Sequence, residues 1–208
     1  KGKDSNSKIK FHDFKKKNIN FTYSKKKLKN CNFFIITVPT PVTKNNRPDL
    51  KYLKNASILV SKSLKKRDVV VFESTTYPGC TEEYCIPILE KFSNLNINKD
   101  FYCGYSPERI NPGDKIHNLE NIDKIISASN RDSLKIITYV YKNITKKKLI
   151  KVDSIKIAEG AKIIENTQRD INIALMNELS ILFKKLNVDF SKVLKAANTK
   201  WNFLDFKP

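Results

Sequence analysis

The amino-acid sequence predicts a doubly wound, mostly parallel α/β sheet that is followed by one long helix. Between residues 33 and 143, short apolar runs alternate with segments of helical periodicity. Strands that alternate with helices at this spacing form parallel sheets covered by helices. Residues 155–186 contain no proline and carry apolar residues at helical intervals. We therefore expect an α/β domain over residues 1–153 and the start of a helical domain over residues 154–208.

Four short runs are expected to form the strands. Residues 33–38 read FFIITV and residues 69–72 read VVVF. Continuous apolar runs of this length are typical of parallel strands that are buried on both faces. Residues 101–105 and 124–127 are the two further candidates. The first run stops at Pro39, because proline cannot continue a strand ladder.

Helical periodicity marks the segments between and after these strands. Asp49 precedes the first such segment and is expected to be its N-cap. The first 30 residues are polar and rich in lysine, with only weak helical texture. The expected helices cover residues 50–64, 81–92, 131–143, 155–186 and 190–197.

Three unusual loops follow the predicted strands. They cover residues 39–41, 74–79 and 106–113. In open parallel sheets, ligands bind beyond the carboxyl ends of the strands. The sequence therefore places its candidate site at that edge of the sheet.

The formal net charge of +19 allows two interpretations. Clustered lysine and arginine would favour a nucleic-acid binder, because such clusters neutralise phosphates. Here the basic residues are dispersed in short runs at the ends of apolar segments, without interleaved aromatic residues. This pattern favours a solvated basic surface, and a nucleic-acid partner is disfavoured. A non-catalytic basic remnant of a decayed enzyme that binds nucleic acid stays as the alternative.

Composition also limits the other function classes. None of the four cysteines forms a CxxC pair and the two histidines stand apart from them, so we expect no metal site. No apolar run approaches the roughly 18 residues that span a bilayer, so we expect a cytoplasmic protein without a membrane segment. Because the chain starts at Lys1 and stops after an aromatic-rich stretch, we expect it to be a fragment that lacks both ends.

The five glycines never fall in the GxGxxG spacing of a dinucleotide-binding turn. Composition alone therefore gives no support for a cofactor. Five ordered segments nevertheless carry a resemblance. They read VPTP (38–41), ESTTYPGCTEE (73–83), GYSPERINPGD (104–114), EGAKIIENTQRDINIALMNE (159–178) and TKWNF (199–203).

These segments resemble the nucleotide-sugar dehydrogenases of the UDP-glucose/GDP-mannose dehydrogenase superfamily, and most closely the branch acting on UDP-N-acetylglucosamine and UDP-N-acetylgalactosamine. The resemblance implies a Rossmann-like sheet, here incomplete at its N-terminus, and an all-α central domain whose helix forms a homodimer. It implies oxidation of the C6 alcohol of a UDP-N-acetylhexosamine to the uronic acid with two NAD, for surface polysaccharide synthesis. The gluco and galacto epimers are not distinguished by these segments.

In that family the reaction passes through a thioester on a cysteine. The matching cysteine is expected beyond Pro208, and Cys80 does not align with it. The fragment itself is therefore expected to be inactive.

Lys162 and Asn166 are four residues apart and so project from one face of the long helix. A cation and an amide side by side suit a developing oxyanion, and the resemblance gives the matching pair this role. Glu108 is implied as the general base that activates water, with Arg109 beside it at the substrate. Where the UDP-glucose enzymes carry a second acid, this chain has Pro112.

The cofactor is implied to lie along the ends of the first two strands. Val38, Pro39 and Thr40 resemble residues that line NAD. Ser74 and Thr75 end the second strand, where they would bond the nicotinamide side or an active-site water, and Thr75 is also counted among the catalytic residues. Ordinary strand-end hydrogen bonding is the alternative for these side chains.

Overall fold

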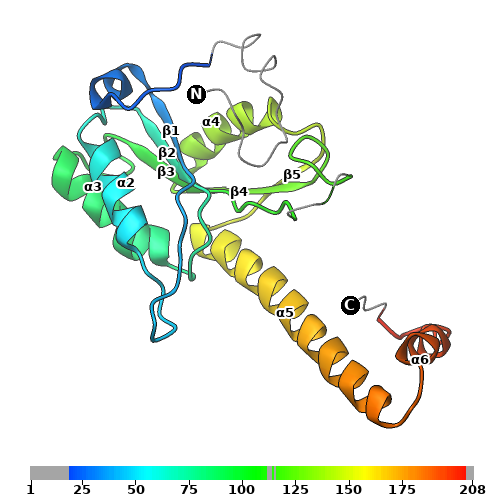
Figure 1. Ribbon diagram of the computed structural model, residues 1–208. Coiled ribbons are helices and arrows are strands. Elements are labelled where there is room, and N and C mark those ends of the chain that lie inside the picture. The colour runs from blue at the N-terminus through cyan, green and yellow to red at the C-terminus, as the bar shows by residue number, and fades with distance from the viewer. Residues whose placement is uncertain (1–18, 112–113, 115, 205–208) are drawn as a thin grey trace.

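The computed structural model describes residues 19–111, 114 and 116–204. Its centre is a five-stranded sheet with the order β1-β2-β3-β4-β5 (Figure 1). The pairs β1–β2, β2–β3 and β4–β5 are parallel, and β3–β4 is antiparallel. The predicted mostly parallel α/β sheet with a long helix after it is confirmed.

The strands are short. Their bounds are β1 Phe33–Ile36, β2 Val69–Phe72, β3 Tyr102–Tyr105, β4 Lys124–Ala128 and β5 Leu149–Lys151. The first four lie within one or two residues of the predicted runs, whereas β5 was not predicted. The prediction of a fully buried first strand was wrong for Ile35, which is 41% exposed, because α4, which covers that face, packs mainly on β3, β4 and β5.

The helices also follow the periodicity. Their bounds are η1 Lys25–Asn30, α2 Lys51–Ser61, η2 Thr81–Cys85, α3 Ile86–Ser93, α4 Arg131–Lys142, α5 Ile155–Lys185 and α6 Phe190–Ala197. The predicted N-cap Asp49 was wrong by one residue. Leu50 occupies the cap position, and the Asp49 side chain instead accepts a hydrogen bond of 3.0 Å from the backbone N–H of Lys51.

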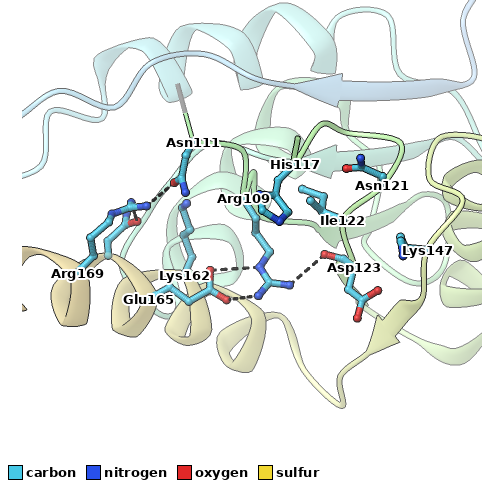
Figure 2. A pocket seen from close by; sticks show the side chains of 11 residues that line it. Arg109, Asn111, His117, Asn121, Ile122, Asp123, Lys147, Lys162, Glu165 and Arg169 are labelled. Atoms are coloured by element: carbon cyan, nitrogen blue, oxygen red, sulfur yellow. Dashed lines mark hydrogen bonds and ion pairs between the residues drawn. The ribbon is translucent and has the colours of Figure 1, made fainter. Parts of the chain in front are cut away.

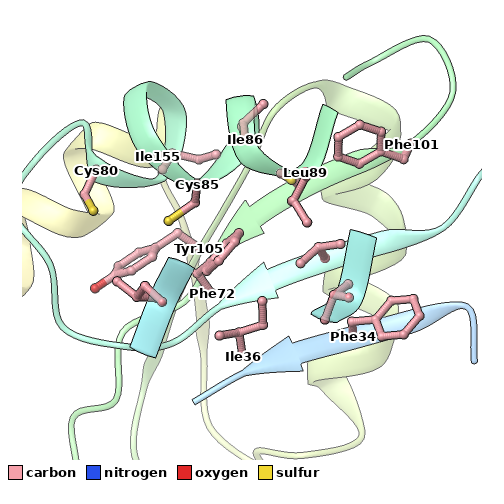
Figure 3. Close-up of a cluster of buried hydrophobic side chains, with 14 of the residues drawn as sticks. Phe34, Ile36, Phe72, Cys80, Cys85, Ile86, Leu89, Phe101, Tyr105 and Ile155 are labelled. Atoms are coloured by element: carbon pink, nitrogen blue, oxygen red, sulfur yellow. The ribbon is translucent and has the colours of Figure 1, made fainter. Parts of the chain in front are cut away.

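Two apolar clusters bury the two faces of the sheet. On one face, Phe34, Ile36 and Phe72 pack with residues of α2 and α3 and with Ile155 at the start of α5 (Figure 3). On the other face, a smaller cluster packs against α4. It contains Val69, Val71, Ile126, Ile137 and Tyr141. Because both faces are covered, the loops at the strand ends remain the accessible part of the sheet.

Helix α5 begins against the sheet and then extends away from it, with α6 at its far end (Figure 1). The N-cap is Ser154, whose hydroxyl accepts a hydrogen bond of 3.2 Å from the backbone N–H of Ile157. None of the helices in the described ranges combines the length and apolar character that crossing a membrane requires.

Gly79 has a φ of +98°, and a Cβ there would lie 2.8 Å from Oε1 of Glu83. Gly79→Ala should therefore lower the free energy of unfolding by about 1–3 kcal/mol. Gly160→Ala is the matched control, because a Cβ at Gly160 would meet nothing nearer than Pro78 at 3.9 Å and alanine is favoured over glycine inside a helix by about 1 kcal/mol.

Urea unfolding of both variants measures the two effects. The account of the Gly79 turn is wrong if Gly79→Ala is as stable as the unchanged chain.

Candidate functional site

A buried carboxylate fixes the first turns of α5 against the loop after β2. Glu159 is fully buried, and its two oxygens accept hydrogen bonds from the backbone N–H groups of Gly79 at 2.6 Å and Thr81 at 2.9 Å. The hydroxyl of Thr76 donates a third bond of 3.2 Å. Thr81 opens the helical segment η2–α3, so the charge lies where free N–H groups and the helix dipole favour an anion.

Residues three, seven and ten positions after Glu159 share its side of the helix. They are Lys162, Asn166 and Arg169, and all three line a cleft of about 500 Å³ (Figure 2). The opposite wall comes from the segment before β4 and from the loop after β3. Its lining residues are Arg109, Asn111, His117, Asn121, Ile122 and Asp123, with Lys147 and Glu165 completing the cleft.

Arg109 joins the two walls. Its guanidinium forms a two-point contact with Glu165 of α5, through Nη2 at 2.8 Å and Nε at 3.3 Å. Nη1 donates a third bond of 3.0 Å to the carbonyl of Asp123 (Figure 2). Paired guanidinium–carboxylate bonds of this kind define direction as well as distance. Arg109 therefore acts as a brace of the cleft, with its charge already partnered.

Lys162 is a buried cation of the cleft whose ammonium keeps its donors. The residue is only 9% exposed, and among the described residues its ammonium forms no hydrogen bond or ion pair. Burial lowers the pKa of Lys162, while the carboxylates of Glu165 and Glu108 oppose that effect. A desolvated ammonium with free donors is suited to bind a negatively charged oxygen.

Asn166 is oriented by its neighbour one turn on. Nη2 of Arg169 donates a bond of 3.0 Å to Oδ1 of Asn166, and Nη1 of Arg169 donates to Oδ1 of Asn111. Because a guanidinium can only donate, Asn166 must present its oxygen to Arg169. Its NH₂ group is then left to donate elsewhere.

Asn166 also lines a second cleft, of about 450 Å³, at the ends of β1 and β2. Thr40 and Thr75 line this cleft from the strand ends. The Thr40 hydroxyl donates a bond of 2.6 Å to the Thr75 carbonyl, whereas the Thr75 hydroxyl has no partner among the described residues. The two clefts therefore meet at Asn166.

The other residues predicted at this edge differ in whether their polar groups already have hydrogen-bond partners. Ser74 is buried, and its hydroxyl donates a bond of 2.6 Å to the carbonyl of Val38, which is the strand-end bonding that the sequence left open. Val38 supplies the acceptor of this bond and Pro39 follows it in the chain, and neither residue lines the second cleft. Glu108 accepts bonds of 2.6 and 2.7 Å from the backbone N–H groups of Arg109 and Ile110 on one oxygen, Oε1.

The cysteines that the structure describes line neither cleft. Cys80 is fully buried in the larger apolar cluster, on the face of the sheet that α2 and α3 cover (Figure 3). Nowhere in the described ranges do three or more histidine, cysteine, aspartate or glutamate side chains gather as metal ligands would. The prediction concerning Pro112 lies outside the described residues.

Sequence reasoning missed Glu159 and Arg169 as members of the site. The sequence did contain a signal for both residues, because polar residues that recur at steps of three and four lie on one helix face together with Lys162 and Asn166. The Arg109–Glu165 pair carried no such signal, since its members lie on separate segments.

Comparison with known proteins shows which family of proteins the chain matches. Residues 6–145 match the model of the NAD binding domain of the UDP-glucose/GDP-mannose dehydrogenase family, and residues 156–208 match the model of its central domain. The chain is 56% identical over 190 residues to the UDP-N-acetyl-D-glucosamine 6-dehydrogenase of Salmonella typhi, a match that covers 91% of this chain and 45% of that protein.

Two further relatives agree. Protein CapL of Staphylococcus aureus is 52% identical over 205 residues, covering 99% of this chain and 48% of that protein. The solved structure of UDP-D-ManNAc dehydrogenase from Pyrococcus horikoshii superposes with a TM-score of 0.82 at 32% identity, covering 89% of this chain and 44% of that one. The chain therefore spans about half the length of the curated relatives it matches, and the resemblance in its motifs is confirmed.

Replacement of Glu159 tests the anchor of α5. Glu159→Gln keeps the shape of the side chain but turns an amide NH₂ toward buried N–H donors, so we expect a loss of about 1–3 kcal/mol in the free energy of unfolding. Glu178→Gln, at an exposed position of the same helix, should change it by less than about 0.5 kcal/mol. Equal urea midpoints for the two variants would contradict the anchoring role.

The pKa of Lys162 can be measured directly. Because burial disfavours the ammonium, Lys162 should lose its proton at a lower pH than the ordinary lysine value of about 10.4. A ¹³C NMR titration of the reductively methylated chain should show this early-titrating amine, and the signal should vanish in Lys162→Arg. An early-titrating signal that persists in that variant belongs to another lysine and would contradict the assignment.

Proposed function

The chain belongs to the UDP-glucose/GDP-mannose dehydrogenase family, and from that premise we propose that it carries part of an NAD-dependent UDP-N-acetylhexosamine 6-dehydrogenase. The whole enzyme would oxidise the C6 alcohol of the sugar to the carboxylate in two steps. The observation that carries this proposal is the position of Lys162 and Asn166. A buried cation and an oriented amide lie where the cleft of about 500 Å³ meets the cleft at the strand ends.

Lys162 and Asn166 are proposed to bind the oxygen on carbon 6. As the hydroxyl proton leaves, negative charge develops on this oxygen before the hydride departs from carbon 6, and preorganised donors stabilise such a charge. The Lys162 ammonium has no competing partner among the described residues, and the bond from Arg169 leaves the NH₂ group of Asn166 available. Because burial lowers its pKa, Lys162 is also proposed to take the alcohol proton as a neutral amine, which turns it into the ammonium that then donates to the oxygen.

The cleft at the ends of β1 and β2 is proposed to hold the nicotinamide end of NAD. When bound, NAD supplies the oxidant, accepting one hydride in each of the two steps. The residues fit this role, because the same cleft is lined by Thr75, whose hydroxyl has no partner among the described residues, and by the apolar residues Val42, Pro48 and Leu50. Thr40 holds the Thr75 backbone in place, and Ser74 and Val38 fasten the two strand ends to each other.

Glu108 is proposed as the general base of the hydrolytic step. Its Oε1 is held by two backbone N–H groups, so Oε2 is the oxygen that would take a proton from water. Arg109 is proposed to shape the substrate side, since its guanidinium already spans the cleft from Glu165 to Asp123.

The wider context follows from the relatives. Two of them carry names of UDP-N-acetyl-D-glucosamine 6-dehydrogenases, which supports a UDP-N-acetylhexosamine as substrate and a place in surface polysaccharide synthesis. We further propose that residues 1–153 form part of the NAD domain and residues 154–208 begin the central domain. Exposed apolar residues along α5, among them Ile164 and Ile171, support dimerisation through this helix, and we place the enzyme in the cytoplasm.

A full-length chimaera tests the function. In it, residues 19–204 replace the matching segment of the Salmonella typhi relative. The chimaera should reduce NAD when given UDP-N-acetylglucosamine. Lys162→Ala should lower turnover by roughly a hundredfold or more, as loss of an oxyanion donor does, whereas Lys184→Ala, near the far end of the same helix, should leave it unchanged.

Full turnover by the Lys162→Ala chimaera would remove this residue from the mechanism. If the unchanged chimaera lacks activity while the chain binds DNA with steep salt dependence, the nucleic-acid alternative is the better account.

A further inference from the structure

A buried cation lies beneath the site and takes no part in the proposed reaction. Lys124 of β4 is only 2% exposed. Its ammonium lies 3.3 Å from Oε1 of Glu73 and donates a bond of 3.4 Å to the carbonyl of Pro107. It also lies 5.5 Å from the centre of the Tyr141 ring, and the Tyr141 hydroxyl donates a bond of 2.5 Å to Glu73.

Such a group is costly to bury. Removing an ammonium and a carboxylate from water is compensated only when their geometry and further hydrogen bonds are good, and apolar residues of similar volume often serve a fold as well. Stability of the sheet alone therefore gives no reason for a lysine at this position. Its partners indicate another reason.

The two polar partners of Lys124 stand immediately before residues of the proposed mechanism. Glu73 follows β2 directly and precedes Ser74 and Thr75. Pro107 precedes Glu108 in the loop after β3. One ammonium thus connects the segment that presents Thr75 with the segment that presents Glu108.

Before Glu108, other bonds hold this loop as far as Ser106, and after Glu108 the side chain of Arg109 ties it to Glu165 and Asp123. The backbone N–H of Ser106 donates to the carbonyl of Phe72 at 3.0 Å, and its hydroxyl donates to the carbonyl of Ile125 at 2.7 Å. Among the described residues, the bond from Lys124 is the hydrogen bond that reaches Pro107. It is the last connection to the sheet before the carboxylate of Glu108.

We propose that Lys124 is a positioning residue, which holds the Glu108 loop and the Thr75 segment at a fixed separation through the Pro107 carbonyl and the Glu73 carboxylate. This inference rests on the proposed function for the meaning of Glu108 and Thr75. Lys124 itself lines neither of the two clefts.

Two variants isolate the bond to Pro107. Glu73→Gln removes the carboxylate charge, keeps the acceptor for Tyr141 and leaves the ammonium on the Pro107 carbonyl. Adding Lys124→Met removes the second charge and that bond together, so no unpaired ion stays buried. If the double variant does not fold, Lys124→Gln in the Glu73→Gln background replaces it, since its side chain is too short to reach Pro107.

Hydrogen–deuterium exchange of the 208-residue chain gives a readout that needs no activity. The amides of Arg109 and Ile110, which bond Glu108, should exchange at least tenfold faster in the double variant than in Glu73→Gln. Exchange within α4 should be equal in the two, and the thermal midpoint of the double variant should be no lower than that of Glu73→Gln, which leaves an unpaired ammonium buried. Unchanged exchange at Arg109 and Ile110 in a folded double variant would overturn the positioning role.

The full-length chimaera gives the second readout. The double variant should lose at least tenfold in kcat relative to Glu73→Gln, with KM for UDP-N-acetylglucosamine within twofold. An equal kcat would overturn the proposal. If the chimaera without any substitution has no activity, the proposed function is refuted. The exchange measurement would still decide the role of Lys124.

Discussion

The carboxylate of Glu159 determines where the long helix meets the sheet, and the geometry of the site depends on that contact. Its bonds to the N–H groups of Gly79 and Thr81 satisfy donors at the start of a helical segment and compensate a charge that is fully buried. Because a helix is rigid along its axis, fixing one turn fixes the turns that follow. The position of α5 therefore brings Lys162 and Asn166 to the strand-end loops.

A second buried charge performs a related task on the sheet side. Lys124 connects the segments after β2 and β3, while Glu159 connects the loop after β2 to α5. The two groups of proposed catalytic residues, one on the loops and one on the helix, are thus held by ionic or charge-assisted bonds inside a mostly apolar core. Such bonds define direction as well as distance, which apolar packing does less well.

The periodicity of the sequence predicted most of the fold, because burial dictates it. Residues 69–72 could only be a strand buried on both faces, and the run from Ile155 could only be a long helix. The short strand β5 was missed because Leu149–Lys151 reads as a mixture of apolar and basic residues. The Asp49 cap was misplaced by one residue, since an aspartate bonds the N–H two residues on as readily within a turn as at a helix start. Lys124 and Glu73 gave no signal, because partners from separate strands have no common spacing.

The central claim is that the Glu159 contact aims Lys162 and Asn166 at the oxygen on carbon 6. A crystal structure of the full-length chimaera with NAD and UDP-N-acetylglucosamine tests it most directly. The account predicts that this oxygen lies within roughly 3.2 Å of both the Lys162 ammonium and the Asn166 NH₂ group, as hydrogen bonds require, while Glu159 keeps its bonds to Gly79 and Thr81. A bound sugar whose carbon 6 lies away from both side chains would contradict it.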